Sequence, residues 1–229
     1  MRETPFIPGE FYHIYNRGVD KRDVFMDADD FNRFLQSMRV FNTVEPCGSI
    51  YEQSRNLKNN VPPPSDPLVR IVCYCLNPNH YHFLLEEVVE NGISEFMKRM
   101  GGGYTKYFNE KYERSGSLFQ GRFKSVHIGS DSYLKTLSAY INLNNQVHKI
   151  TSKFFRSSWM EYVRQHDQQE VPVEKMCSNR IILDSFRNAN EYKKFAEETI
   201  ATIVARRYEA GSKKEKVAEM KSVDVAFLE

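Results

Sequence analysis

Two hydrophobic patterns alternate along the chain, one with the two-residue repeat of strands and one with the three- and four-residue spacing of helices. The first predicts strands at residues 11–16, 68–76, 80–86 and 122–128. The second predicts helices at residues 27–42, 92–112, 131–145 and 190–208. Glycine is costly inside a helix, so the run Gly101-Gly102-Gly103 predicts a bend or a break in the second helix.

The order of these elements indicates an α+β fold. Two strands flank the turn signal Asn77-Pro78-Asn79, which predicts a hairpin. We therefore expect a largely antiparallel sheet of about four strands, with helices packed on it. We assign residues 1–165 to this domain, with residues 45–67 as an insertion loop. Residues 166–229 form a helical extension and a charged tail.

Composition narrows the class of protein. The 229 residues have a mean hydropathy of −0.58, and no window approaches the roughly 18 consecutive apolar residues of a membrane helix. No apolar signal core follows the first residues. We therefore expect a cytoplasmic protein without a membrane partner. The four cysteines are too scattered for a disulfide framework, and Cys73 and Cys75 fit strand packing better than metal binding.

Charge is unevenly distributed, although the total is only +2. Residues 1–90 carry 9 basic and 13 acidic side chains, a net of −4, whereas residues 91–150 carry 9 and 4, a net of +5. A basic middle segment is typical of a phosphate-binding groove, and an ordinary solvated face gives the same count.

His80 and His82 are the first candidates for chemistry. Alternate residues of a strand point to one face, so both imidazoles project side by side and can share a metal ion, while Tyr81 points to the core. The alternative is a half-buried strand with two hydrogen-bonded histidines.

Tyr140 and Asn144 lie four residues apart and therefore on one face of the predicted helix. A tyrosine hydroxyl can attack a phosphodiester when a metal polarises the phosphate, and an amide oxygen suits Mg²⁺ or Mn²⁺. The alternative is that Tyr140 is an ordinary aromatic at the edge of the core.

Residues 115–124 combine basic and aromatic side chains. Arg122 and Lys124 would share one face of the fourth strand and hold phosphates, while Phe119 and Phe123 stack or pack. The simpler alternative is an inward Phe123 beside two exposed cations.

These sites occur within a longer series of sequence blocks. The blocks are Tyr12-His13-Ile14-Tyr15-Asn16-Arg17-Gly18, then Cys75-Leu76-Asn77-Pro78-Asn79-His80-Tyr81-His82-Phe83, then Gly116-Ser117-Leu118-Phe119-Gln120-Gly121-Arg122-Phe123-Lys124, then Tyr133-Leu134 and Tyr140-Ile141. In this order they resemble the single-tyrosine (Y1) transposases of the HUH endonuclease superfamily, in particular the REP-associated, IS200-like group. The resemblance covers about residues 11–162 and implies a ferredoxin-like domain.

The resemblance implies a reaction and its residues. Tyr140 would be the nucleophile, and His80, His82 and Asn144 would hold a divalent Mg or Mn ion. The tyrosine would cleave single-stranded DNA, keep the 5′ phosphate as a phosphotyrosine and free a 3′ hydroxyl that can rejoin strands. The implied DNA partner is a hairpin with a flanking single strand. The residues expected to contact DNA are Arg17, Arg122, Lys124, Phe119 and Lys106.

Two features depart from the family pattern. Asn144 is followed by Asn145 where the family usually has proline, which we expect to extend or reshape the helix end, and Asn77 precedes Pro78-Asn79-His80 where the family usually has methionine. The insertion also carries no family motif. Three alternatives remain: a domesticated protein that binds DNA hairpins without cleaving them, a replication initiator or relaxase, and a regulatory or adventitious metal site. The sequence also leaves open a homodimer.

Overall fold

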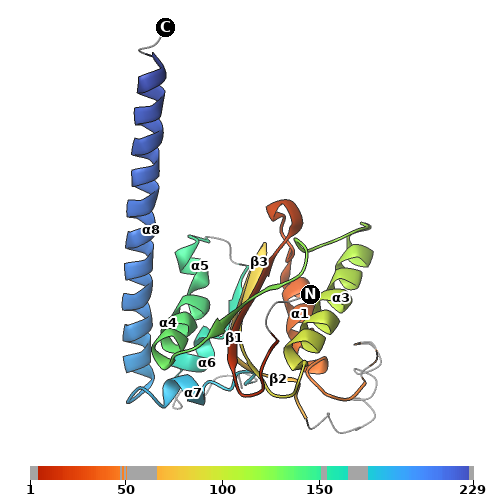
Figure 1. The fold of residues 1–229 in the computed structure, drawn as a ribbon. Helices are drawn as coiled ribbons and strands as arrows, with labels where there is room; N and C mark the ends of the chain where they lie inside the picture. The colour runs from red at the N-terminus through yellow and green to blue at the C-terminus, as the bar shows by residue number, and fades with distance from the viewer. Residues whose placement is uncertain are drawn as a thin grey trace.

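The computed structural model describes residues 5–46, 48, 50, 66–150, 154–164 and 175–226, with side chains up to residue 209 (Figure 1). Most of the predicted 45–67 insertion lies outside these residues. In the described part of the chain, no helix is both long and apolar enough to cross a membrane.

The centre of the fold is an antiparallel sheet of five strands in the order β4-β1-β3-β2-β5. The strands are β1 (Phe11–Arg17), β2 (Val69–Asn77), β3 (His80–Glu87), β4 (Lys124–Ile128) and the short β5 (Arg156–Ser157). This confirms the predicted α+β class, the four predicted strands and the hairpin of β2 and β3. Two residues are too few to give a sequence pattern, so β5 was not predicted.

One prediction about β4 was wrong. The strand begins at Lys124, and Arg122 lies in the preceding loop. The chain bends there because Gly121 has a φ of +71° and its carbonyl accepts a hydrogen bond from Asn16 Nδ2 at 3.1 Å. Arg122 and Lys124 therefore do not share a strand face.

Two helices, α1 (Ala28–Val40) and α3 (Gly92–Lys111), cover one face of the sheet (Figure 1). The predicted break in α3 was wrong, because the helix is continuous through its three glycines. Apolar side chains before and after the glycines anchor α3 in the core, which outweighs the helix-breaking tendency of glycine. Gly103 also lets α3 approach α1, since a Cβ there would lie 2.8 Å from Phe41 Cε2.

The other face is covered by α4 (Asp131–Asn142), α5 (Asn144–Val147), α6 (Trp159–Val163), α7 (Arg180–Leu183) and α8 (Ala189–Ala226). The predicted 131–145 helix is thus two helices, separated at Leu143. The first turns of α8 pack into this core through Tyr192, Ala196 and Ile200. Residues 211–221, expected as a tail, continue the backbone of α8.

Strand alternation divides the side chains between two cores. On β3, Tyr81 packs in the α1–α3 core, as predicted, and its neighbours His80 and His82 face the α4–α5 side. In β2, the register shifts between Ile71 and Cys73, so that successive residues Val72 and Cys73 both enter the α4 core. Cys73, Cys75 and Cys177 are buried free thiols.

Candidate active site

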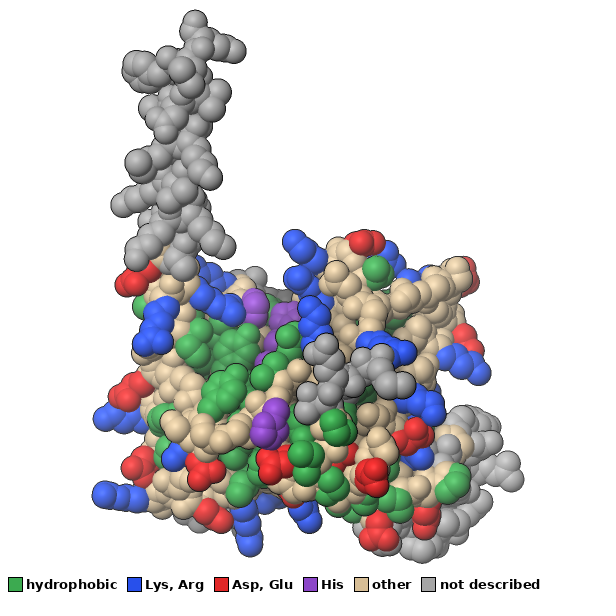
Figure 2. Space-filling view, viewed as in Figure 1, with side chains coloured by type: hydrophobic (Ala, Val, Ile, Leu, Met, Phe, Trp, Pro, Cys, Tyr) green, Lys and Arg blue, Asp and Glu red, His purple; other side chains and the backbone are tan. Residues whose placement is uncertain are grey.

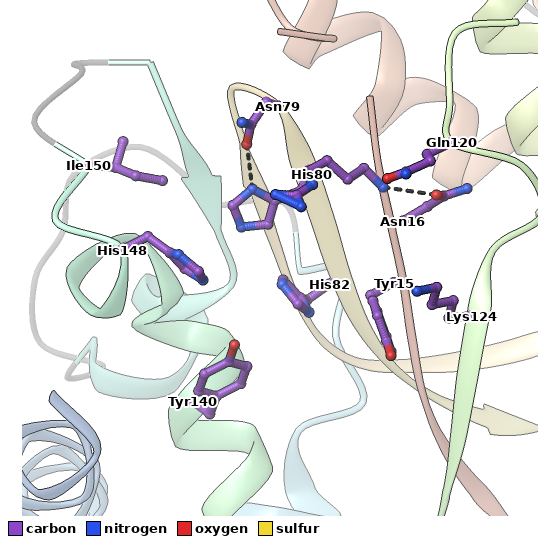
Figure 3. Close-up of a pocket in the computed structure, with 11 residues that line it drawn as sticks. Tyr15, Asn16, Asn79, His80, His82, Gln120, Lys124, Tyr140, His148 and Ile150 are labelled. Carbon is purple, nitrogen blue, oxygen red and sulfur yellow. Dashed lines mark hydrogen bonds between the residues drawn. The ribbon is translucent and has the colours of Figure 1, made fainter. Parts of the chain in front are cut away.

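A recess of about 430 Å³ opens beside the histidine pair on the α4–α5 side of the sheet (Figure 3). Side chains from β1, β3, β4, α4 and the loop before β4 converge on it. Its lining consists of Tyr15, Asn16, Arg17, Asn79, His80, His82, Gln120, Lys124, Tyr140, His148 and Ile150. In the space-filling view, histidines are exposed in a hollow with Lys and Arg side chains around it (Figure 2).

His80 and His82 project from one face of β3, as predicted. Their ring centroids lie 5.2 Å apart at an interplanar angle of 88°. His82 is buried and His80 is half-buried at the mouth of the recess. Both rings are therefore held by the sheet and remain directed at the same space.

The β2–β3 turn fixes the position of His80. The Pro78 carbonyl accepts hydrogen bonds from Val24 N at 2.7 Å and Phe25 N at 3.0 Å. The Asn79 carbonyl accepts from Gly18 N at 2.8 Å, and Asn79 Nδ2 donates to Lys21 O at 3.1 Å. The turn before His80 is thus tied to the segment that follows β1, which includes the short 3-10 helix η1 (Val19–Lys21).

Hydrogen bonding also fixes which nitrogen of His80 carries the proton. Nδ1 lies 2.6 Å from Asn79 Oδ1, and an amide oxygen can only accept, so Nδ1 donates. In the neutral ring, Nε2 then keeps a lone pair. Nε2 lies 3.1 Å from Asn144 Oδ1, another acceptor, and Asn77 Nδ2 donates to both atoms at 2.9 and 2.7 Å.

His82 has a corresponding partner in His13 of β1. His82 Nδ1 and His13 Nε2 lie 2.8 Å apart. When His82 donates this proton, its own Nε2 keeps a lone pair, and the hydrogen bond fixes the tautomer and orientation of the ring as an acceptor does for a metal-ligating histidine. His13 was not predicted, because the sequence does not show that β1 pairs with β3.

Burial keeps these imidazoles neutral. Desolvation lowers the pKa of His13 and of His80 to about 4, and it holds the pKa of His82 well below its ordinary value. Neutral imidazole is the form that binds a metal. Two imidazole nitrogens and the Asn144 amide oxygen therefore fit a divalent ion as a donor set. Among the described residues, no group of three His, Cys, Asp or Glu side chains forms an alternative site.

Tyr140 lies on α4, opposite the histidines. Its ring is 5.7 Å from that of His82 and 6.4 Å from that of His13, edge to face in both cases. Figure 3 shows its hydroxyl directed into the recess. Ser130 caps α4 by accepting a hydrogen bond from Tyr133 N at 3.3 Å, and buried Leu134, Leu137 and Ile141 hold the opposite face.

Asn144 is fully buried at the start of α5. The end of the helix is reshaped, as we expected from the missing proline. Leu143, with φ −113° and ψ 24°, separates α4 from α5. Asn144 Oδ1 nevertheless reaches His80. Its Nδ2 is buried without a hydrogen-bond partner among the residues that the structure describes.

The five residues expected to contact DNA divide into three groups. Arg17 and Lys124 line the recess. Lys106 and Phe119 line a separate groove, and Phe119 is buried to 8% exposure. Arg122 is exposed and belongs to the lining of neither.

Two further residues of the site, His148 and Asn77, were not predicted from the sequence. The spacing of His148 could have indicated its place. His148 is four residues after Asn144, and its ring lies 4.9 Å from that of His80 at the mouth of the recess. The same four-residue spacing that links Tyr140 to Asn144 continues to His148. Asn77 stands where the family usually has methionine, a departure that did not by itself indicate its hydrogen bonds to His80 and Asn144.

Comparisons with known proteins find similarity to transposases. Residues 65–144 match a family model described as transposase IS200 like. A search of curated proteins found no match. Among solved structures, a REP-associated tyrosine transposase bound to a REP hairpin is similar at 15% identity and a TM-score of 0.46, over 71% of this chain and 84% of that chain. A Deinococcus radiodurans R1 protein assigned as a transposase is similar at 12% identity and a TM-score of 0.36, over 60% and 92%.

The matched residues include the hairpin with both histidines, all of α3, all of α4 with the tyrosine, and Asn144 at the start of α5. The matched residues 65–144 contain His80, His82, Tyr140 and Asn144, and this part of the chain is similar to the IS200-like transposase domain.

Proposed function

We propose that this protein cleaves and rejoins single-stranded DNA through Tyr140, with a divalent metal held by His80, His82 and Asn144. The observation that carries the proposal is the convergence of His80, His82 and Tyr140 on one recess, with the buried Asn144 Oδ1 3.1 Å from His80 Nε2 behind its lining. They come from residues 80–82 and 140–144, so the fold alone brings them together. A structural role for the histidines does not require a tyrosine hydroxyl pointing into the same space.

The chemistry is a transesterification. The Tyr140 oxygen bonds to phosphorus, its proton leaves to solvent, and the bond from phosphorus to the 3′ oxygen breaks. The 3′ oxygen takes up a proton and leaves as a hydroxyl, while the 5′ phosphate stays on the tyrosine. A bound Mg²⁺ or Mn²⁺ supplies Lewis-acid polarisation of the phosphate oxygens. Reversal of the same steps rejoins the strand.

The other residues of the recess orient the reactants. Edge-to-face contact with His82 restricts the ring of Tyr140. Arg17 and Lys124 are exposed cations at the recess and suit the phosphates on either side of the reacting one. His13 and Asn79 orient the two imidazoles.

The test is formation of a covalent adduct with a DNA hairpin that carries a flanking single strand, in Mg²⁺ or Mn²⁺, detected on a denaturing gel. Tyr140→Phe should abolish the adduct and keep DNA binding, because only the hydroxyl is removed. Tyr133→Phe is the matched control, since Tyr133 is exposed on the same helix outside the recess, and it should keep the adduct.

Two results would contradict the proposal. An adduct that persists in Tyr140→Phe would place the nucleophile on another residue. DNA binding without any adduct in the unmodified protein would favour the non-cleaving, hairpin-binding alternative.

A further inference from the structure

A second groove of about 470 Å³ lies between α3 and the loop that precedes β4. Its floor is apolar and its rim carries amides, hydroxyls and one lysine. The lining consists of Asn16, Tyr81, Met97, Gly101, Gly102, Thr105, Lys106, Asn109, Ser117, Leu118, Phe119, Gly121 and Phe123. The volume falls in the range of about 300–1,000 Å³ that is usual for small-molecule sites.

The wall formed by α3 has an unexplained notch. A Cβ at Gly101 or Gly102 would meet no atom within 4 Å, whereas one at Gly103 would collide with Phe41. Packing therefore requires glycine at position 103 and leaves room for a side chain at 101 and 102. Because glycine destabilises a helix interior, two unforced glycines are best explained by a ligand that approaches the helix backbone closely.

The groove adjoins the recess that holds Tyr140. Asn16 lines both, and in the loop Gln120 lines the recess while its neighbours Phe119 and Gly121 line the groove. The loop is held against the end of β1, since Gln120 N donates to Arg17 O at 2.8 Å and Asn16 Nδ2 donates to the Gly121 carbonyl. A chain-like ligand leaving the recess thus enters the groove by crossing one fixed loop residue.

We propose that this groove binds one unpaired nucleotide of the same DNA strand, next to the phosphodiester that Tyr140 cleaves. The base would lie against the notch of Gly101 and Gly102, next to Phe123, the half-buried aromatic side chain of the lining. An apolar floor accepts the face of any base, which is typical of single-strand binding.

Lys106 supplies the charge that the phosphate of this nucleotide requires. Its side chain is 79% exposed, and its ion pair with Glu110 is 3.8 Å long and solvent-screened. Its ammonium group can therefore turn to a phosphate at little cost. The inference rests on the proposed function for the identity of the ligand and on the groove for its location.

The test measures the affinity of short single-stranded DNA by fluorescence anisotropy, in the Tyr140→Phe background so that no cleavage occurs. Gly102→Leu should weaken binding about tenfold, the size of the loss of one base contact. It should also raise the melting temperature, because leucine favours helix more than glycine does and a Cβ at this position meets open space. Gly102→Ala should weaken binding less. Ala201→Leu is the matched control, since it adds an exposed leucine on α8 outside both cavities, and it should leave binding unchanged.

Abasic substitutions along the strand locate the contact in a protein without any change to α3. One position should lose about tenfold in affinity when its base is removed, and that loss should vanish in Gly102→Leu. Lys106→Gln should lower the log–log salt slope of binding by about 0.7, the value for one phosphate contact on a single strand.

Each outcome decides between the two proposals. Equal affinity of Gly102→Leu and the unmodified protein, or a base whose removal costs the same in both, overturns the groove and leaves the tyrosine chemistry intact. A normal groove response without any covalent adduct overturns the chemistry and leaves the groove. If Gly102→Leu proves unstable, the abasic scan combined with Lys106→Gln decides alone, and the absence of both effects rejects the inference.

Discussion

The two faces of the sheet bury polar groups in different ways. On the α1–α3 face, the Asp30 carboxylate is fully buried and accepts hydrogen bonds from Lys111 Nζ, Tyr112 OH and Met26 N, all at 2.8 Å, and from Tyr107 OH at 3.1 Å. On the α4–α5 face, the buried groups are neutral imidazoles and amides that bond mainly to one another.

This difference distinguishes a network that stabilises the fold, around Asp30, from a candidate binding site, around the histidines. The charge of Asp30 is balanced by Lys111, and its acceptors are fully used. Among the described residues, no carboxylate forms a hydrogen bond or ion pair with the histidine cluster, and two of its acceptor atoms, His80 Nε2 and Asn144 Oδ1, lie 3.1 Å apart. Two facing acceptor atoms contribute little to the stability of the fold, and they are suited to binding a cation between them.

The largest expected effect concerns the histidine face. His80→Ala combined with His82→Ala should reduce Mn²⁺ binding, measured by electron paramagnetic resonance, below detection and should abolish cleavage. The free energy of unfolding should fall by only about 1–3 kcal/mol, because a few neutral hydrogen bonds are lost. If the double variant still binds metal, the metal ligands do not lie on the histidine face of the sheet.

The opposite face should give the opposite result. Asp30→Ala should lower the free energy of unfolding by about 3 kcal/mol, because it leaves Lys111 paired with Asp27 alone and removes the acceptor of Met26 N and Tyr107 OH. Mn²⁺ affinity of the folded protein should be unchanged. Urea denaturation with and without metal measures the free energy of unfolding and the Mn²⁺ affinity. Asp30→Asn is the control, because it keeps the shape of the side chain and removes its charge. A loss of metal affinity would mean that the two faces are coupled.

Acid should destabilise the histidine face. The pKa of His13 is about 4 in the folded protein and near 6.5 when unfolded, so between these values the unfolded chain binds a proton that the folded one does not. Stability in the metal-free protein should therefore fall as the pH drops through this window, by about 1.4 kcal/mol per pH unit from His13. Urea midpoints near neutral pH and near about pH 5 should differ less in His13→Gln than in the unmodified protein. Equal pH dependence would exclude a buried neutral His13.

The smallest effect separates neighbouring glycines of α3. Gly101→Ala should stabilise the fold by about 0.5–1 kcal/mol, because the new methyl group meets open space. Gly103→Ala should destabilise it by about 1–3 kcal/mol, because its Cβ would lie 2.8 Å from Phe41. Thermal unfolding of the two variants gives opposite shifts, and shifts of the same sign would contradict the close approach of α3 to Phe41.

Sequence patterns predicted the helices and strands better than they predicted the contacts between them. Alternation placed His80 and His82 on one face and Tyr81 on the other, because strand periodicity is local. The spacing of Tyr140 and Asn144 was also local, and the helix change at Leu143 did not separate them from the histidines.

What could not be predicted depends on contacts between distant segments. His13 reaches His82 only through the pairing of β1 with β3. The continuity of α3 depends on packing against α1, which local propensity does not include. Arg122 and Lys124 were expected on one strand, but Gly121 turns the chain before the strand begins.

The turn before His80 has a further consequence. Its carbonyls and the Asn79 side chain are held by the segment that follows β1, so His80 is rigid before any ligand arrives. The conformational entropy of fixing that imidazole is lost when the protein folds and does not count against binding. We therefore expect the affinity for the proposed metal ion to depend on residues 18–25, which lie outside its proposed ligands, because a looser turn would have to be ordered again in each binding event.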